Sequence, residues 1–123
     1  MNELHSAPIS TLLEEAANKR DVSFGKRVTY SPKVFIPLTH LCRDKCGYCT
    51  FAQPPARLEV PYLTPEQVLN IASQGARTGC HEALFTLGEK PELRYPTAQT
   101  WLTSNGYDST IHYLYEMAKL VIE

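Results

Sequence analysis

Residues 34–49 read VFIPLTHLCRDKCGYC. The apolar, β-branched run at 34–38 predicts a buried strand, although Pro37 limits hydrogen bonding near its end. A cysteine cluster with the spacing C-x3-C-x2-C begins four residues after that strand. Its members are Cys42, Cys46 and Cys49. The surrounding segment 40–61 is rich in proline and predicts a long loop, and loops of this length are often functional.

Three cysteines in one loop indicate iron-sulfur chemistry. Thiolates at this spacing can bind three corners of a 4Fe-4S cube and leave the fourth iron without a protein ligand. An electron-transfer cluster normally has four cysteine ligands, whereas an open iron can bind a substrate or a cofactor. We therefore predict that Cys42, Cys46 and Cys49 are metal ligands.

A structural zinc site is the alternative interpretation of these cysteines. Such sites have four protein ligands and typically contain paired C-x2-C elements, of which this chain has one. Cys80 or His40 would supply the fourth ligand in that case. Cys80 follows a predicted helix end and precedes a predicted strand, where a small apolar residue packs well, so we interpret it as structural.

The segment after the loop predicts a parallel βαβ unit. An N-cap, a first-turn proline and the return partner of a capping box are present as Thr64, Pro65 and Gln67. A helix should begin there and end at Gly79. Its predicted buried face consists of Val68, Leu69, Ile71, Ala72 and Ala76. The run ALFTL at 83–87 predicts a second buried strand, reached by a right-handed crossover.

We predict two regions in the chain: a leading helix and linker at 1–27, and the start of a core domain at 28–123. The leading helix follows the apolar spacing of Ile9, Leu12, Leu13, Ala16 and Ala17. In the second region, a short helix around Trp101 should end at Gly106, and Asp108 should cap a further helix.

Gly88 and Glu89 directly follow the second predicted strand. In an α/β barrel this end of the strands forms the rim of the active site. A glycine permits close backbone approach, and a carboxylate can accept hydrogen bonds from a cationic amino group. The alternative is a solvated turn, but the cysteine loop one crossover earlier favours a binding site.

The composition narrows the class of protein. The chain has 123 residues, of which 43% are hydrophobic and 20% charged, as is usual for a globular domain. A net charge of -1 gives no reason to expect a nucleic-acid partner. No apolar run approaches the roughly 18 residues that cross a bilayer, and the first residues do not form a secretory signal. We therefore expect a cytoplasmic protein without a membrane partner.

The cysteine loop resembles the signature of radical S-adenosylmethionine enzymes, in which an aromatic residue, here Tyr48, precedes the third cysteine. The resemblance implies that S-adenosylmethionine chelates the open iron and yields a 5'-deoxyadenosyl radical that removes a substrate hydrogen. It also implies the amino-terminal part of a (β/α) partial TIM barrel with parallel strands. Tyr48 would lie near the adenine. Gly88 and Glu89 resemble the Gly-Gly-Glu motif that contacts the methionine amino group, with Leu87 in place of the first glycine.

Longer strings resemble the amino-terminal region of the FO synthase family: YSPKVFIPLTHLCRDKCGYCTFAQPP, YLTPEQVL, EALFTLGEKPE and GYDSTIHYL. This resemblance covers residues 28–123. It implies radical cyclisation of a tyrosine-derived ribityl-diaminouracil adduct to the 5-deazaflavin FO, with loss of ammonia. It further implies an external electron donor and a partner FO synthase subunit or domain. Thr50, Phe51 and Gln53 belong to the same string, where substrate contact and loop packing are both open.

A complete barrel of this kind needs about six βα units, whereas this chain predicts two strands. We therefore expect a fragment or a truncated gene product. Three other functions stay open: a different radical S-adenosylmethionine reaction, a small zinc-stabilised interaction module, and an inert remnant.

Overall fold

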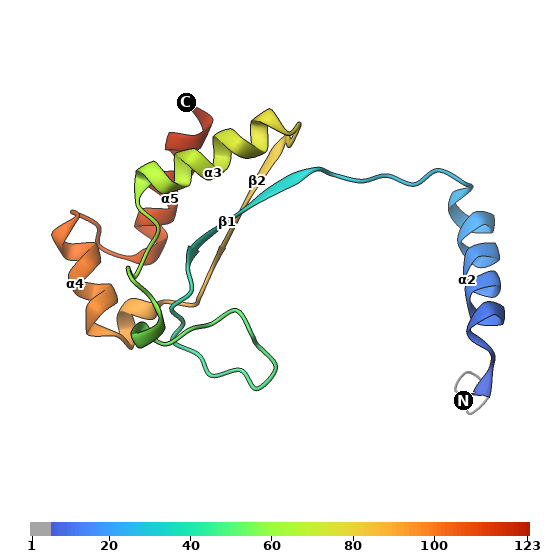
Figure 1. Ribbon diagram of the computed structural model, residues 1–123, viewed down its shortest axis with the longest axis horizontal. Coiled ribbons are helices and arrows are strands. Elements are labelled where there is room, and N and C mark those ends of the chain that lie inside the picture. The colour runs from blue at the N-terminus through green and yellow to red at the C-terminus, as the bar shows by residue number, and fades with distance from the viewer. Residues whose placement is uncertain (1–5) are drawn as a thin grey trace. The chain divides into compact units, whose positions relative to one another are not determined.

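The computed structural model describes residues 6–123 and divides the chain into two compact units, Met1–Tyr30 and Ser31–Glu123. Figure 1 labels the helices and strands: α2 (Ile9–Phe24), β1 (Lys33–Thr39), α3 (Pro65–Arg77), β2 (Glu82–Leu87), α4 (Pro96–Ser104) and α5 (Thr110–Ile122). Two short 3-10 turns, Pro55–Arg57 and Pro91–Leu93, lie between them. Since β1 and β2 form a parallel pair joined through a helix, the predicted α/β class is confirmed.

The first unit contains a longer helix than the sequence predicted. α2 continues to Phe24, through most of the segment expected to be a linker, and stops at Gly25. Gly25 has a φ of 67°, and its N–H donates to the Asp21 carbonyl at 2.9 Å. No side chain within α2 is buried. Residues 1–5 of the predicted leading region lie outside the described residues, and the boundary after residue 27 stays a prediction. Within residues 6–123, no helix combines the length and apolar character needed to cross a membrane.

The two strands pair in a register that begins with Lys33 opposite Glu82. Glu82 accepts hydrogen bonds from the Lys33 ammonium and the Ser31 hydroxyl, and the Lys33 bond is the main reason that the pKa of Glu82 lies below its ordinary value. The register becomes irregular between Pro37 and Thr39. A proline lacks the N–H that a regular ladder requires, so the predicted weakening near the end of β1 is confirmed.

The predicted helix start at α3 is confirmed in detail. The Gln67 N–H donates to Thr64 Oγ1 at 3.3 Å, and the Thr64 N–H donates to Gln67 Oε1 at 2.8 Å. These two bonds form the capping box that the sequence predicts. At the other end, Thr78 is the C-cap and the next residue, Gly79, has a φ of 84°, as expected for a left-handed stop.

The predicted buried face of α3 is only partly correct. Val68 is buried, but Leu69 is 39% exposed and Ala76 is exposed as well. Gly75, a residue without a side chain, is also buried and packs against Val34 of β1. Because the backbone of α3 approaches β1 at that point, the buried stripe is narrower than the apolar pattern of the sequence.

β2 was also predicted to be buried, and its first half is not. Glu82, Ala83 and Leu84 are exposed, whereas the last three residues of the strand are half-buried. In the part of the chain that the structure describes, β2 pairs with β1 alone. An edge strand of this kind has one unpaired row of backbone groups and an incompletely covered face.

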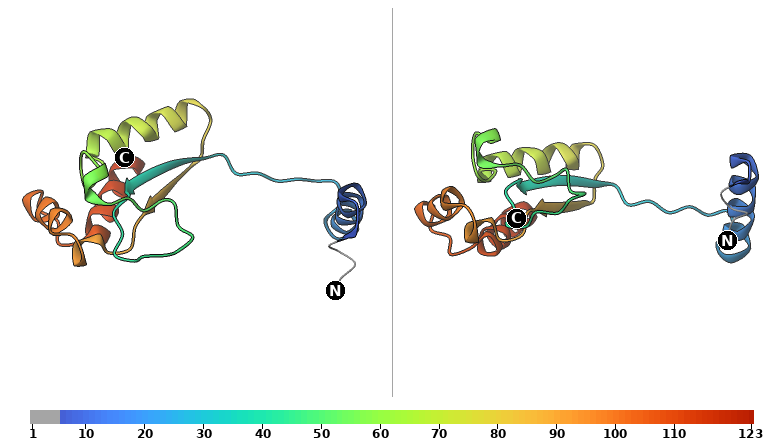
Figure 2. Two further views of the ribbon diagram at one scale, coloured as in Figure 1. Left: turned by 60° about the horizontal axis from the view of Figure 1, so that its bottom comes forward. Right: turned by 90° about the horizontal axis from the view of Figure 1, so that it is seen from below.

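The core lies between α3, α4, α5 and the carboxyl half of β1 (Figure 2). Its buried hydrophobic residues are Ile36, Leu38, Leu41, Tyr62, Val68, Ala98, Leu102, Tyr113 and Met117. The Tyr62 hydroxyl lies 2.7 Å from Thr110 Oγ1, which donates to the Glu92 carboxylate at 2.6 Å. Tyr113 donates to the Leu63 carbonyl at 2.6 Å. Among the described side chains, no buried nitrogen or oxygen lacks a hydrogen-bond partner.

The helices after β2 match the predictions except at one cap. α4 is followed by Gly106 with a φ of 81°, as expected. The N-cap of α5 is Ser109 and not the predicted Asp108. Ser109 Oγ accepts a hydrogen bond from the His112 backbone N–H at 3.1 Å. The Asp108 carboxylate does not cap the helix and lies 3.6 Å from the His112 side chain, at Nδ1. Serine and aspartate are comparably good caps, so position rather than residue type decided between them.

Gly75→Ala tests the contact between α3 and β1. A Cβ at Gly75 would lie 2.5 Å from Val34 Cβ, which no rotamer change can relieve. We expect the substitution to lower the free energy of unfolding by about 1–3 kcal/mol, although alanine favours helices. Urea denaturation followed by circular dichroism measures the change. Ser73→Ala on the exposed side of α3 is the control, and unchanged stability of Gly75→Ala would contradict the contact.

The buried tyrosines predict a loss of stability at alkaline pH. Burial raises the pKa of Tyr62 to about 12 and also raises that of Tyr113. Because tyrosines in the unfolded chain ionise near pH 10, the unfolded state releases these protons first, and the free energy of unfolding should fall as pH rises above about 10. Urea denaturation at a series of pH values tests this. Tyr62→Phe should reduce the fall of the unfolding free energy with pH, whereas Tyr48→Phe, at an exposed site, should leave that fall unchanged.

Candidate functional site

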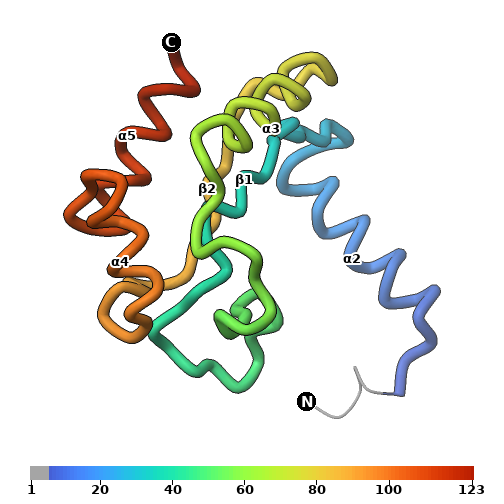
Figure 3. The backbone as a smooth tube through the Cα atoms, turned by 60° about the vertical axis from the view of Figure 1, so that its left-hand side comes forward, coloured from blue at the N-terminus to red at the C-terminus, as the bar shows by residue number. Residues whose placement is uncertain are grey.

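The cysteine loop leaves the carboxyl end of β1 and lies beside the residues that follow β2 (Figure 3). The Glu89 N–H donates to Cys42 Sγ at 3.3 Å, and the Arg43 N–H donates to the Glu89 carbonyl at 2.8 Å. The Gly88 N–H donates to the Thr39 carbonyl at 3.3 Å. The structure therefore brings the predicted ligand Cys42 together with the predicted contacts Gly88 and Glu89.

Gly88 is buried at the point where the two segments meet. A Cβ at this position would lie 1.9 Å from the Leu41 carbonyl oxygen and 2.7 Å from Cys42 Cβ. No larger residue fits without a shift of the backbone. The glycine is therefore required by the close approach of the loop.

The Glu89 side chain lies beside cationic groups of the loop and of the segment after β2. Its carboxylate is half exposed and lies 3.8 Å from both the Arg43 guanidinium and the Lys90 ammonium. Lys90 has a φ of 34° and precedes the 3-10 turn Pro91–Leu93. The carboxylate is thus surrounded by cationic groups but open to solvent on one side. This arrangement suits an acceptor for a further ammonium group.

Cys42, Cys46 and Cys49 line one cavity of about 270 Å³. Its other lining residues are Asp44, Lys45, Ala52, Gln53, Pro54, Arg94 and Tyr95. Cys42 is half-buried, whereas Cys46 and Cys49 are exposed. Within residues 6–123, no three His, Cys, Asp or Glu side chains lie close enough together to hold a metal ion. All three cysteines belong to one loop without regular secondary structure, and their sulfurs are not gathered around a common metal position among the described residues. Three thiols are a donor set that iron-sulfur clusters use, and binding one would require the loop to close around it.

Tyr48 does not line this cavity, and its side chain is 90% exposed. Gly88 and Glu89 do not line the cavity either, although the Glu89 N–H contacts Cys42 Sγ. The contact of Tyr48 with adenine stays a prediction.

Phe51 and Gln53 help to close the base of the loop. His40 Nδ1 lies 3.0 Å from the Phe51 carbonyl oxygen, and the two rings lie 4.5 Å apart. The Gln53 N–H donates to the His40 carbonyl at 2.9 Å. The Gln53 side chain donates to the Thr50 carbonyl at 3.4 Å. Of the two open roles for this string, loop packing is the one that these contacts support.

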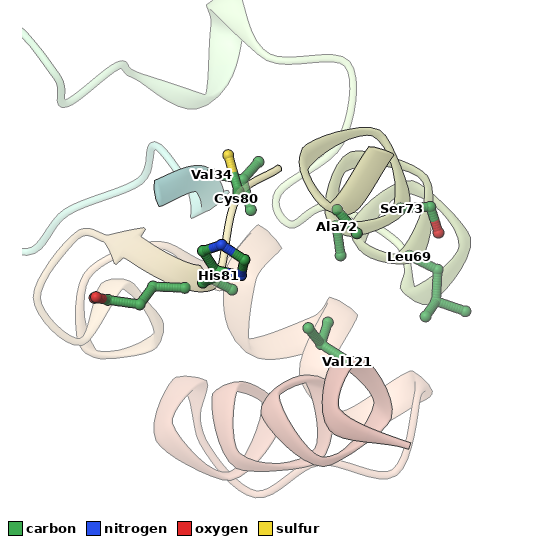
Figure 4. Close-up of a pocket in the computed structure, with 10 residues that line it drawn as sticks. Val34, Leu69, Ala72, Ser73, Cys80, His81 and Val121 are labelled. Atoms are coloured by element: carbon green, nitrogen blue, oxygen red, sulfur yellow. The ribbon is translucent and has the colours of Figure 1, made fainter. Parts of the chain in front are cut away.

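Cys80 lies in a different cavity of about 280 Å³, with Val34, Ala72 and Val121 among its lining residues (Figure 4). It precedes the amino end of β2, whereas Cys42 follows the carboxyl end of the paired β1. Six strand residues at about 3.3 Å each separate these ends by about 20 Å. Cys80 is therefore too far away to be a fourth ligand for the cysteine loop.

The sequence did not single out Arg94, which reaches the loop from the segment after β2. Its Nη1 donates to the carbonyls of Cys42 and Arg43 at 3.3 and 3.0 Å, and lies 3.5 Å from that of Asp44. The only available signal was a lone arginine seven residues after the strand, and such a residue is typical of many solvated turns.

Gly88→Ala tests whether the close approach fixes the loop. We expect the added methyl group to displace Leu41 and Cys42 and to break the hydrogen bond from the Arg43 N–H to the Glu89 carbonyl. Hydrogen exchange at the Arg43 amide should then become at least several-fold faster. Gly47→Ala in the same loop is the matched control, because a Cβ there meets nothing within 4 Å. Equal exchange rates in both variants would contradict the assignment.

The chain is similar to curated proteins named FO synthase. It is 48% identical to that of Mycobacterium leprae over 94% of this chain, and 43% identical to that of Streptomyces coelicolor over 98% of it. It spans about 15% of the length of each of these relatives.

A third relative is the 7,8-didemethyl-8-hydroxy-5-deazariboflavin synthase of Methanopyrus kandleri. It is 49% identical over 78% of this chain, which covers 29% of that protein. No protein-family profile and no solved structure matches the chain. The similarity predicted from the four strings is confirmed, and the chain is a homologue of the FO synthases over nearly its whole length.

Proposed function

We propose that this chain forms the cofactor-binding part of a radical S-adenosylmethionine enzyme of FO biosynthesis. One observation carries the proposal: three thiols from a single loop line one cavity at the carboxyl edge of a parallel strand pair. The similarity to FO synthases supports the assignment to deazaflavin formation. In the complete enzyme, the two strands would belong to a (β/α) partial barrel, with further strands beside the uncovered edge of β2.

In this proposal, Cys42, Cys46 and Cys49 hold a 4Fe-4S cluster. The cluster and S-adenosylmethionine together would supply a radical that removes a hydrogen atom from the substrate. Glu89 would accept hydrogen bonds from the methionine amino group, because its carboxylate is half exposed. The backbone of Gly88 lies close to Leu41 and Cys42, and the Glu89 N–H donates to Cys42 Sγ.

The proposed substrate is a tyrosine-derived adduct of a ribityl-diaminouracil, which the enzyme would cyclise with loss of ammonia. An external donor would supply the electron, and a second FO synthase subunit or domain would supply the adduct. No catalytic acid or base is assigned to this chain.

Anaerobic reconstitution of the chain with iron and sulfide tests the proposal. We expect a 4Fe-4S electron paramagnetic resonance signal after reduction, and a change in that signal when S-adenosylmethionine is added. Cys42→Ala should lose most of the bound iron, because each thiolate holds one corner of the cluster. Cys80→Ala is the matched control and should retain it.

Metal analysis and the spectra of the same samples show which results would contradict the proposal. One zinc per chain with no cluster would replace this proposal with the zinc-stabilised interaction module. Equal iron content in wild type and Cys42→Ala would show adventitious binding. A cluster whose signal does not respond to S-adenosylmethionine would limit the function to electron transfer.

A further inference from the structure

We infer that Arg94 is a positioning residue for the cysteine loop. The inference rests on the proposed cluster site and assigns this residue a role in holding Cys42 in place. Arg94 follows the 3-10 turn Pro91–Leu93 and is half-buried. It lines the same cavity as the three thiols.

The guanidinium lies where backbone carbonyls of the loop converge. Nη1 lies 3.3, 3.0 and 3.5 Å from the carbonyl oxygens of Cys42, Arg43 and Asp44. These residues belong to no helix or strand, so their carbonyls have no regular backbone ladder to join. A guanidinium group only donates hydrogen bonds, so it suits a position where several carbonyl oxygens meet. Its positive charge also makes these hydrogen bonds stronger than bonds from a neutral donor.

A second contact restricts the orientation of the guanidinium. Arg94 Cζ lies 4.9 Å from the centre of the Tyr95 ring, which also lines the cavity. A planar guanidinium can stack on the ring while its edge donates to carbonyls. A lysine at this position keeps the charge but has neither the plane nor the rigid fork. We therefore expect Arg94→Lys to restore only part of the function.

The loop is thus fixed from two sides at its first cysteine. The backbone after β2 holds Cys42 through the Glu89 N–H. Arg94 Nη1 donates to the carbonyls of Cys42 and Arg43 and lies near that of Asp44. Cys46 and Cys49 lie beyond these contacts and are exposed. Arg94 therefore prepares one ligand of the site and leaves the other two free to close around a metal.

Thiol labelling of the metal-free chain tests this role without requiring a cluster. Peptide mapping after iodoacetamide treatment gives a separate rate for each cysteine. Arg94→Gln should raise the rate at Cys42 by about tenfold, since a charge-assisted bond no longer opposes local opening. Arg94→Lys should give an intermediate rate. Arg77→Gln, which alters an exposed arginine of α3, should leave the rate unchanged.

Cys80 is the internal control, because it lies at the opposite end of the strands. A rise at Cys42 alone supports the inference. An unchanged labelling rate at Cys42 would overturn it. An equal rise at Cys42 and Cys80 would also overturn it, because Arg94 would then stabilise the whole fold.

Reconstitution then separates this inference from the proposed function. If wild type assembles a cluster, Arg94→Gln should lose iron to a chelator several-fold faster than Arg77→Gln, and equal loss rates would overturn the role in the site. If wild type assembles none, the proposed function fails, and Arg94 has no cluster to position even if labelling shows that it holds the loop.

Discussion

The approach of Gly88 to the backbone of Leu41 and Cys42 is the constraint on which the candidate site depends. Two parallel strands end at the same edge of a sheet, but their following segments meet only if no side chain separates them. With no Cβ at Gly88, the next amide can reach a cysteine sulfur. The position of the first thiol is thus set by backbone geometry, and the loop extends from that fixed point.

The same loop is anchored at its base and open at its tip. Thr39 Oγ1 donates to the Pro61 carbonyl at 2.7 Å, and the Leu63 N–H donates to the Leu38 carbonyl at 2.9 Å. These bonds join the two ends of a connection of more than twenty residues. The exposed tip around Cys46 and Cys49 has few such contacts, so it can rearrange without disturbing the core, as the proposed cluster binding would require.

Local signals were sufficient to predict most of the fold. The capping box at Thr64, the glycine stops and the two strands depend on neighbouring residues, which the sequence shows directly. Burial was less predictable. Leu69 and Ala76 match an apolar helical stripe but are exposed, whereas the close contact of α3 with β1 is made by Gly75. The cysteine spacing identified the candidate ligands. Arg94 was missed because its partners are about fifty residues away and are carbonyls, which every residue carries.

The sequence distance between the loop and its supports has a consequence for biosynthesis. The groups that hold Cys42 lie 47 and 52 residues later in the chain. A ribosome adds about 5–20 residues per second, so the thiols are made several seconds before Glu89 and Arg94 exist. During that interval the nascent loop has no structure to organise its sulfurs, and they are open to oxidation. If the loop binds the proposed cluster, iron and sulfide would be best delivered after the second strand is in place.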